Sequence, residues 1–256
     1  MRTVLTLCNQ NTKVFLAEWK SHIVALLAPF FFLYLFSEWF RSDYVDNPVP
    51  FMLVGLIVVE IFQFALWKSS VVEECVIGVP RLYVFTGQLI SIAMIAAAMG
   101  LVIYAIGFVV VGKEITSLWT LAAVVGLILL LSLVFASVGL FLTSAVGNTK
   151  TREALISALI LTLPFFSGAY VASSLLPAMI QTLGNFNPLT YAVALFRAAS
   201  LELWSAPAEM LLNKELTVEA GHVTITPALS LLVLTGLGLV FFVLSACCFA
   251  KKYGKR

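Results

Sequence analysis

The sequence is poor in charged residues: only 11% of its 256 residues are charged, 15 of them Lys or Arg and 13 Asp or Glu. Soluble domains carry about 25% charged residues, so these few cannot supply a water-facing surface for a globule of this size. The scarcity excludes a soluble enzyme and a disordered chain, and the lack of a basic face excludes a nucleic-acid binder. The remaining composition, 61% hydrophobic with a mean hydropathy of +1.05, predicts a membrane protein.

Cysteine and histidine are scarce as well. The chain has four cysteines, too few for a disulfide scaffold, and two histidines. His22 and His222 are expected on opposite faces of the membrane, so they cannot share a cluster and we expect no metal site. The apolar stretches also lack a buried pair of nucleophile and base, which predicts no catalytic residues.

One stretch comes close to a nucleotide-binding motif. Residues 107–114 read GFVVVGKE, with two glycines and a lysine at the spacing of a phosphate-binding loop. That loop needs Ser or Thr directly after the lysine to hold magnesium, and Glu114 occupies this position. We therefore expect that this chain binds no cofactor and does not hydrolyse ATP by itself.

Six stretches are long and apolar enough to cross a bilayer, which takes about 20 residues in a helix. Each stretch is continuously apolar and does not alternate, so helices are expected and a barrel is not. We predict an all-α membrane protein with a single transmembrane domain over residues 1–256. The predicted spans are 22–40, 50–67, 86–111, 117–145, 153–172 and 226–250.

The basic residues orient these spans. Six spans place both termini on one side of the membrane, and 11 of the 15 basic residues fall on that side. The other four are Arg41, Lys113, Arg197 and Lys214. Because Lys and Arg gather on the cytoplasmic side, we expect both termini in the cytoplasm.

Two cytoplasmic segments have the pattern of short helices outside the spans. Residues 9–21 mix apolar and charged positions, which favours a helix in the membrane interface with Trp19 at headgroup depth. An ordinary juxtamembrane tail is the alternative. Residues 68–85 join the second and third spans and are apolar enough to form a short helix against another protein or the membrane surface.

The external segment 173–225 is unusually long. Its first half is apolar but is broken by Pro177, Gly184 and Pro188, which favours a re-entrant helical hairpin. Its second half is polar and is expected to face the outside. Asn187 and Pro188 form a helix start, because Asn is a favoured N-cap and Pro a favoured first residue. That helix is expected to reach about Glu202, with Arg197 reaching outward to water.

Glu60 lies in the middle of the second span, where an unpaired charge costs several kcal/mol. Gln63 and Trp67 follow three and seven residues later and share its helix face. One interpretation is a polar stripe on a transport pathway. The alternative is a hydrogen bond between helices from a neutral carboxyl group.

Pro164 interrupts the fifth span. It removes a backbone donor and is expected to bend the helix, which frees the carbonyl group near Ile160. Phe165 and Phe166 follow directly and favour a hydrophobic constriction at the bend. Residues that pack or face lipid are the alternative.

Residues 165–197, FFSGAYVASSLLP…NFNPLTYAVALFR, are the most specific part of the chain. They resemble the permease subunits of ABC-2 type (type V) ABC transporters, of the kind that export drugs or lipids. The resemblance covers essentially the whole chain. Supporting features are Trp19-Lys20 at the end of the interfacial helix and Glu73-Glu74 followed by Pro80.

The resemblance implies a homodimer in the bacterial cytoplasmic (inner) membrane, among its lipids, with a separate cytoplasmic ATPase subunit on each copy. ATP and Mg²⁺ would bind to those partners. Residues implied in coupling to the ATPase are Trp19, Lys20, Glu73, Glu74 and Arg81. Residues implied in the transport pathway or gate are Glu60, Gln63, Phe64, Leu163, Phe165 and Phe166. The external hairpin, with its motif residues Asn187, Pro188, Tyr191 and Arg197, would close the outer end.

The expected function is therefore that of an exporter permease for an amphipathic or lipid-like small molecule. Within the same class, the alternative cargo is a lipid-linked glycan or polysaccharide. An ATP-independent secondary transporter belongs to another class and would need several intramembrane charges or inverted repeats, which the sequence lacks.

Overall fold

The structure is a computed structural model of the 256-residue chain. It describes residues 48–70, 80–111, 117–171, 173–204, 216–220 and 223–252. It also describes residues 12, 13, 15–17, 20, 24, 27, 29–31, 33–35, 206, 207 and 211.

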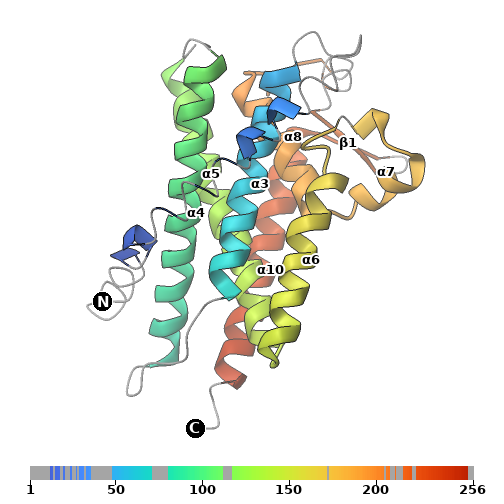
Figure 1. Ribbon diagram of the computed structural model, residues 1–256. Helices are drawn as coiled ribbons and strands as arrows, with labels where there is room; N and C mark the ends of the chain where they lie inside the picture. The colour runs from blue at the N-terminus through green and yellow to red at the C-terminus, as the bar shows by residue number, and fades with distance from the viewer. Residues whose placement is uncertain are drawn as a thin grey trace.

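The described part of the chain is dominated by long helices that run side by side (Figure 1). They are α3 (Pro48–Ser70), α4 (Arg81–Val111), α5 (Leu118–Ala145), α6 (Thr149–Phe166) and α10 (Pro227–Lys252). Helix α5 is central, because it contacts α3, α4, α6 and α10. Side chains from these helices form one apolar core, and its largest fully buried residues include Phe62, Phe85 and Phe135.

Polar side chains mark where several helices begin. Ser117 accepts a hydrogen bond from the Trp119 backbone N–H at 3.1 Å and caps α5. Asn148 accepts from the N–H groups of Lys150 and Thr151 and caps α6. Each cap satisfies backbone donors that have no partner within their own helix.

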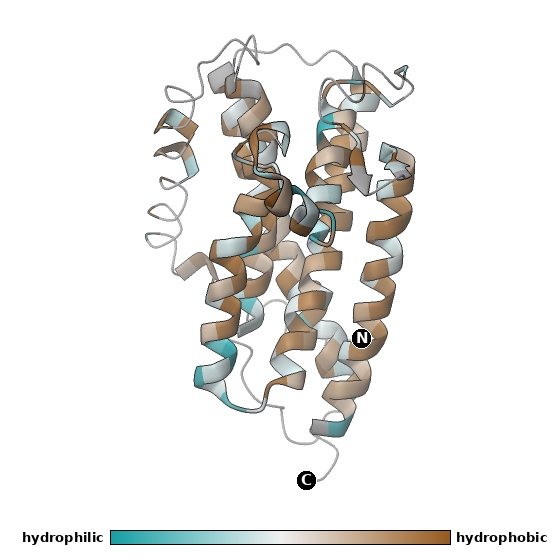
Figure 2. Cartoon of the chain, turned by 90° about the vertical axis from the view of Figure 1, so that its right-hand side faces the viewer, coloured by the Kyte–Doolittle hydropathy of each residue, from teal (hydrophilic) through white to brown (hydrophobic). Residues whose placement is uncertain are grey.

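Four predicted spans are confirmed as helices long and apolar enough to cross a membrane. They comprise Phe51–Ser70, Arg81–Val109, Leu118–Ala145 and Pro227–Lys251. Figure 2 shows hydrophobic residues along the helices and hydrophilic residues concentrated towards the helix ends. The predicted first span, 22–40, and the predicted interfacial helix, 9–21, lie mostly outside the described residues. The described positions within both have helical backbone.

The prediction for the fifth span was wrong in its bounds. Helix α6 begins at Thr149 and ends at Phe166, whereas the sequence predicted 153–172. It carries Lys150, Arg152 and Glu153 near its start, and it is not among the four helices above. It ends early because Gly168 adopts a left-handed conformation with φ 71°, a common way for a helix to stop.

The segment after α6 forms a helical hairpin at one end of the molecule (Figure 1). It contains a short 3₁₀ helix (Ser173–Leu175), α7 (Ala178–Gly184) and α8 (Pro188–Ser200). The predicted helix start at Asn187 is confirmed. Residues 189–199 of α8 are all buried, because α8 packs against α3, α5 and α10.

The described part of the chain is mostly helical, as the all-α prediction expects, and one short pair of strands is an exception. Strands β1 (Val218–Ala220) and β2 (Val223–Ile225) pair antiparallel, with Val218 opposite Ile225 and Ala220 opposite Val223. Branched side chains favour strands, and this pair occupies part of the segment that the sequence predicted to be polar and irregular.

Candidate functional site

A cavity of about 650 Å³ lies between α3 and α6, and it is lined mostly by apolar side chains. We call it the α3–α6 cavity. Its lining residues are Pro29, Glu60, Gln63, Phe64, Trp67, Ser157, Ile160, Leu161, Pro164, Phe165 and Tyr170. The predicted face of α3 is therefore a real surface, because Glu60, Gln63 and Trp67 all border this one cavity.

Glu60 lies near the middle of α3 and is only 6% exposed. Among the described residues no hydrogen bond or ion pair to its carboxyl group is found, and the Tyr170 phenol, which lines the same cavity, interacts with it electrostatically. The alternative that the sequence allowed, a hydrogen bond between helices, is thus not seen among these residues. A buried carboxylate is costly to keep charged in this position unless a positive charge lies beside it.

Aromatic rings line two walls of the α3–α6 cavity. Phe64 and Trp67 lie on α3 with ring centroids 6.2 Å apart. Phe165 and Tyr170 lie at the end of α6 and just after it, with centroids 5.5 Å apart and planes inclined at 59°. The cavity therefore presents aromatic faces around one carboxyl group and one amide.

The structure brings four of the six predicted pathway residues together at this cavity: Glu60, Gln63, Phe64 and Phe165. Leu163 and Phe166 lie elsewhere. Leu163 packs against the core, and Phe166 lines a separate cavity nearer the hairpin. Side chains two residues apart on a helix point in different directions, so Leu163 and Phe165 cannot share one surface.

The sequence missed five lining residues: Ser157, Ile160, Leu161, Tyr170 and Pro29. The first three precede Phe165 at helical spacing, so the helix periodicity around Phe165 could have identified them. Tyr170 comes from the turn beyond α6, and no periodic signal predicts its position.

The predicted bend at Pro164 falls in the last turn of α6, so this proline helps to end the helix. A residue distant in sequence, Asn187, satisfies a backbone carbonyl group in the last turn of α6. The side-chain amide of Asn187 donates to the Leu163 carbonyl oxygen at 2.7 Å, while its side-chain oxygen accepts from the Leu189 N–H at 3.0 Å. Asn187 therefore ends one helix and begins another.

The rest of the Asn-Pro-Leu-Thr-Tyr motif holds α7 against α8. The Thr190 hydroxyl donates to the Gly184 carbonyl oxygen at 2.8 Å, and the Tyr191 hydroxyl donates to that of Asn185 at 2.5 Å. Burial raises the pKa of the Tyr191 phenol, which keeps it protonated and able to donate. Pro188 occupies the first position of α8, as predicted.

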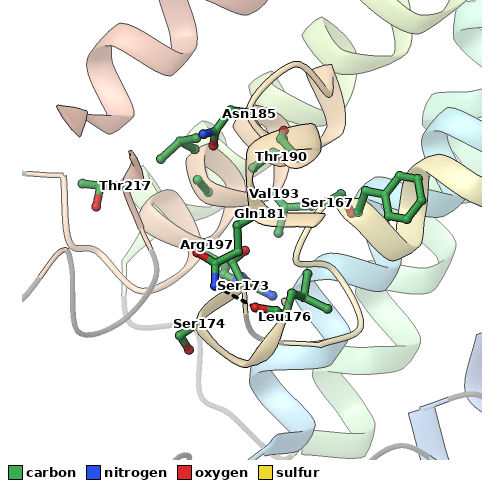
Figure 3. A pocket seen from close by; sticks show the side chains of 14 residues that line it. Ser167, Ser173, Ser174, Leu176, Gln181, Asn185, Thr190, Val193, Arg197 and Thr217 are labelled. Carbon is green, nitrogen blue, oxygen red and sulfur yellow. Dashed lines mark hydrogen bonds between the residues drawn. The ribbon is translucent and has the colours of Figure 1, made fainter. Parts of the chain in front are cut away.

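A second cavity of about 370 Å³ lies under the hairpin, and we call it the outer cavity (Figure 3). Hydroxyl and amide groups line much of it, including those of Ser167, Ser173, Gln181, Asn185 and Thr217. Its lining comes from α6, α7, α8, β1 and the turns between them.

Arg197 also lines the outer cavity, and its predicted outward reach to water was wrong. The side chain is 2% exposed. Its guanidinium donates to the Gly168 carbonyl oxygen at 2.7 Å and lies 3.5 Å from the centroid of the Phe51 ring. The aromatic face and the carbonyl group compensate the burial of the charge, so outward extension is not required.

At the C-terminal end of α3, two side chains from neighbouring helices donate hydrogen bonds to carbonyl groups of the last turn. The Arg152 guanidinium, on α6, donates to the Ser70 carbonyl oxygen at 3.0 Å. The Thr143 hydroxyl, on α5, donates to that of Ser69 at 2.8 Å. These carbonyl groups have no partner within the helix, and a positive charge is favourable at a helix C-terminus. The sequence did not identify Arg152 as a contact residue.

The predicted coupling residues are only partly described. Trp19, Glu73 and Glu74 lie outside the described residues, and Lys20 is an exposed residue with helical backbone. Arg81 begins α4, so residues 81–85 belong to this long helix and the predicted separate segment 68–85 was too long.

A comparison with known protein families gives a match over most of the chain. The family model for the ABC-2 type transporter matches residues 2–201. No curated protein matches the chain.

Proposed function

Because the chain belongs to the ABC-2 type transporter family and is thus an integral-membrane permease component of an ABC-type transporter, we propose that it exports an amphipathic or lipid-like small molecule. The proposed direction is from the cytoplasmic side outward, across a bacterial inner membrane. The chain itself is a transport component and not a catalyst.

The observation that carries this proposal is the α3–α6 cavity. It lies along the second half of α3, and aromatic and aliphatic side chains line it around the polar groups of Glu60 and Gln63. An amphipathic molecule needs such a combination, an apolar surface for its body and a few polar groups for its head. The volume of about 650 Å³ suits one small organic molecule.

Energy would come from outside the chain. Permeases of this family generally work with an ATPase subunit, and we propose two permease copies with one ATPase bound to each. ATP and Mg²⁺ would bind to those subunits. Residues 71–80, Lys20 and the first turn of α4 at Arg81 would contact the ATPase, with Trp19, Glu73 and Glu74 as further contacts. A movement of these contact residues would be transmitted to α3 through the last turn of that helix.

The outer hairpin would act as the external closure. Phe165 would face the cargo, while Phe166 would separate the α3–α6 cavity from the outer cavity. Asn187 joins the end of α6 to α8 and would make the hairpin and the cavity wall move together.

Reconstitution tests the proposal. The chain is extracted with its native partners, placed in liposomes, and ATP hydrolysis is measured with amphipathic drugs or with lipid-linked glycans. Stimulation by the drugs is expected. Stimulation by the glycans alone would assign the other cargo class, and extraction without any ATPase subunit would contradict the ATP-driven mechanism.

A further inference from the structure

We propose that the α3–α6 cavity selects a lipophilic organic cation, with its positive charge beside Glu60 and its apolar body against the aromatic rings. This inference rests on the proposed function and narrows its cargo to one charge type. It rests on two features of the described lining: an acidic group beside aromatic rings, and the lack of a basic residue.

The first step concerns Glu60. Its carboxyl group borders the cavity, and no cationic side chain among the described residues forms an ion pair with it. A buried charge needs a partner of opposite sign, or it is strongly disfavoured. A bound cation supplies the partner that this part of the protein does not, so occupancy of the cavity and charge on Glu60 support each other.

The second step concerns the rings. A cation is attracted to the face of Trp, Tyr or Phe within about 6 Å of the ring centroid. Trp67 already shows this behaviour, because the Lys68 ammonium lies 4.8 Å from the centroid of its ring. Phe165 and Tyr170 provide further aromatic surface on the other wall of the cavity.

The third step is the lack of positive charge in the lining. The lining residues of the α3–α6 cavity that the structure describes include no Lys, Arg or His. Arg197 lies at the outer cavity, and Arg152 is engaged at the end of α3. The Lys68 ammonium lies over the Trp67 ring, but Lys68 is not among the lining residues. An anionic head group beside Glu60 would therefore meet no positive charge from the lining itself, which disfavours acidic lipids as the preferred occupant.

The test uses three probes of similar shape. Tetraphenylphosphonium is a permanent cation, tetraphenylborate is the matching anion, and triphenylphosphine oxide is neutral. Binding to the purified full chain in lipid nanodiscs is measured by equilibrium dialysis, and partition into empty nanodiscs is subtracted. We expect saturable binding of the phosphonium alone.

The variant Glu60→Gln keeps the shape of the side chain and removes its charge. Phosphonium binding is expected to weaken by roughly tenfold or more, the scale of one desolvated charge contact. The matched control is Glu153→Gln, which removes the same charge from an exposed position on α6 and is expected to bind as the unaltered chain does. Equal unfolding temperatures of the two variants establish that any difference arises at the cavity.

Three outcomes would overturn the inference. Equal binding of the neutral probe indicates an apolar groove for lipid chains. Unchanged phosphonium binding in Glu60→Gln removes the role of the charge. A lack of phosphonium binding to a chain that is dimeric in the nanodisc indicates that a second copy covers the groove.

The inference and the proposed function fail in different ways. Phosphonium binding that depends on Glu60, in a chain whose complex shows no ATP-driven transport, retains the cation site and contradicts the exporter. ATP-driven export of neutral amphiphiles that is insensitive to Glu60→Gln retains the exporter and contradicts the cation site.

Discussion

Gly55 lies where α3 touches the backbone of the turn after α6. A Cβ atom at this position would overlap the Ala169 carbonyl oxygen and would lie 2.7 Å from the Ala169 Cα. The obstacle is backbone, which cannot rotate aside. We expect Gly55→Ala to lower the free energy of unfolding by about 1–3 kcal/mol, as overpacking does, measured by denaturant unfolding in detergent.

Gly126 provides the control for that substitution. It lies on α5, and among the described residues no atom comes within 4 Å of the place that its Cβ atom would take. A methyl group there has room, so Gly126→Ala is expected to leave stability unchanged or to raise it by up to about 1 kcal/mol through helix propensity. Equal losses in the two variants would show that the contact with Ala169 is not the cause.

Asn187 has two functions that substitution can separate. Asn187→Ser keeps an N-cap for α8 but cannot reach the Leu163 carbonyl oxygen, whereas Asn187→Ala loses both contacts. We expect a loss of about 1–3 kcal/mol for the buried carbonyl group and about 1 kcal/mol more for the cap. The unfolding temperature should be highest for the unaltered chain, lower for Asn187→Ser and lowest for Asn187→Ala. A Ser variant as stable as the unaltered chain would contradict the link to α6.

At the residue scale, the sequence predicted site residues correctly where their spacing placed them on one face of a single helix. Glu60, Gln63 and Trp67 are spaced to share a face, and they do. It failed at Arg197, because its burial depends on Phe51, a residue distant in sequence that no local pattern connects to it. Tyr170 was missed for a similar reason, since a turn places it at the cavity.

Among the elements, the start of α6 supports the end of α3. We expect Arg152→Met, which keeps an apolar stem and removes the donor to Ser70, to lower stability by about 1.5–3 kcal/mol. Amide hydrogen exchange should accelerate in the last turn of α3. If this turn transmits the motion of the ATPase, stimulation by cargo should also fall.

Lys150→Met is the matched control, because Lys150 is an exposed cation two residues from Arg152. It removes the same charge without touching α3, so exchange and stability should match those of the unaltered chain. Faster exchange in both variants would attribute the effect to net charge and not to the contact.

At this scale the sequence predicted the long apolar helices well, since continuous hydrophobicity over about 20 residues is typical of a membrane-spanning helix. Helix α6 was misplaced because Gly168, which ends it, lies within an otherwise apolar stretch. The strands β1 and β2 are three residues each, too short for an alternating pattern to emerge from a polar segment.

For the whole molecule, the segments that connect the long helices lie at the two ends of the helix bundle (Figure 1). The turn between α5 and α6 lies at the end of the molecule where α10 finishes, and the hairpin with α7 and α8 lies at the other. Basic residues near the first end, including Lys68, Arg81 and Lys251, predict that it is cytoplasmic.

Cysteine labelling tests this orientation in a background without native cysteines. Gly147→Cys lies in the turn before α6, and Met179→Cys lies on α7 at a residue that is 76% exposed. A membrane-impermeant maleimide should label position 179 on intact cells and should reach position 147 only after permeabilisation. The reverse pattern would invert the proposed topology and the direction of export with it.

Arg197 also sets an order for biosynthesis. Its buried guanidinium depends on the Gly168 carbonyl oxygen and the Phe51 ring, so α8 can settle only after α3 and the end of α6 are in place. Both partners leave the ribosome before Arg197 does. The hairpin can therefore dock against α3 and the end of α6 as soon as it is made, while its contact with α10 forms only after that later helix is made. A chain that lacks α3 would leave the Arg197 cation without its aromatic partner, and the quality-control machinery of the cell would meet an unshielded charge.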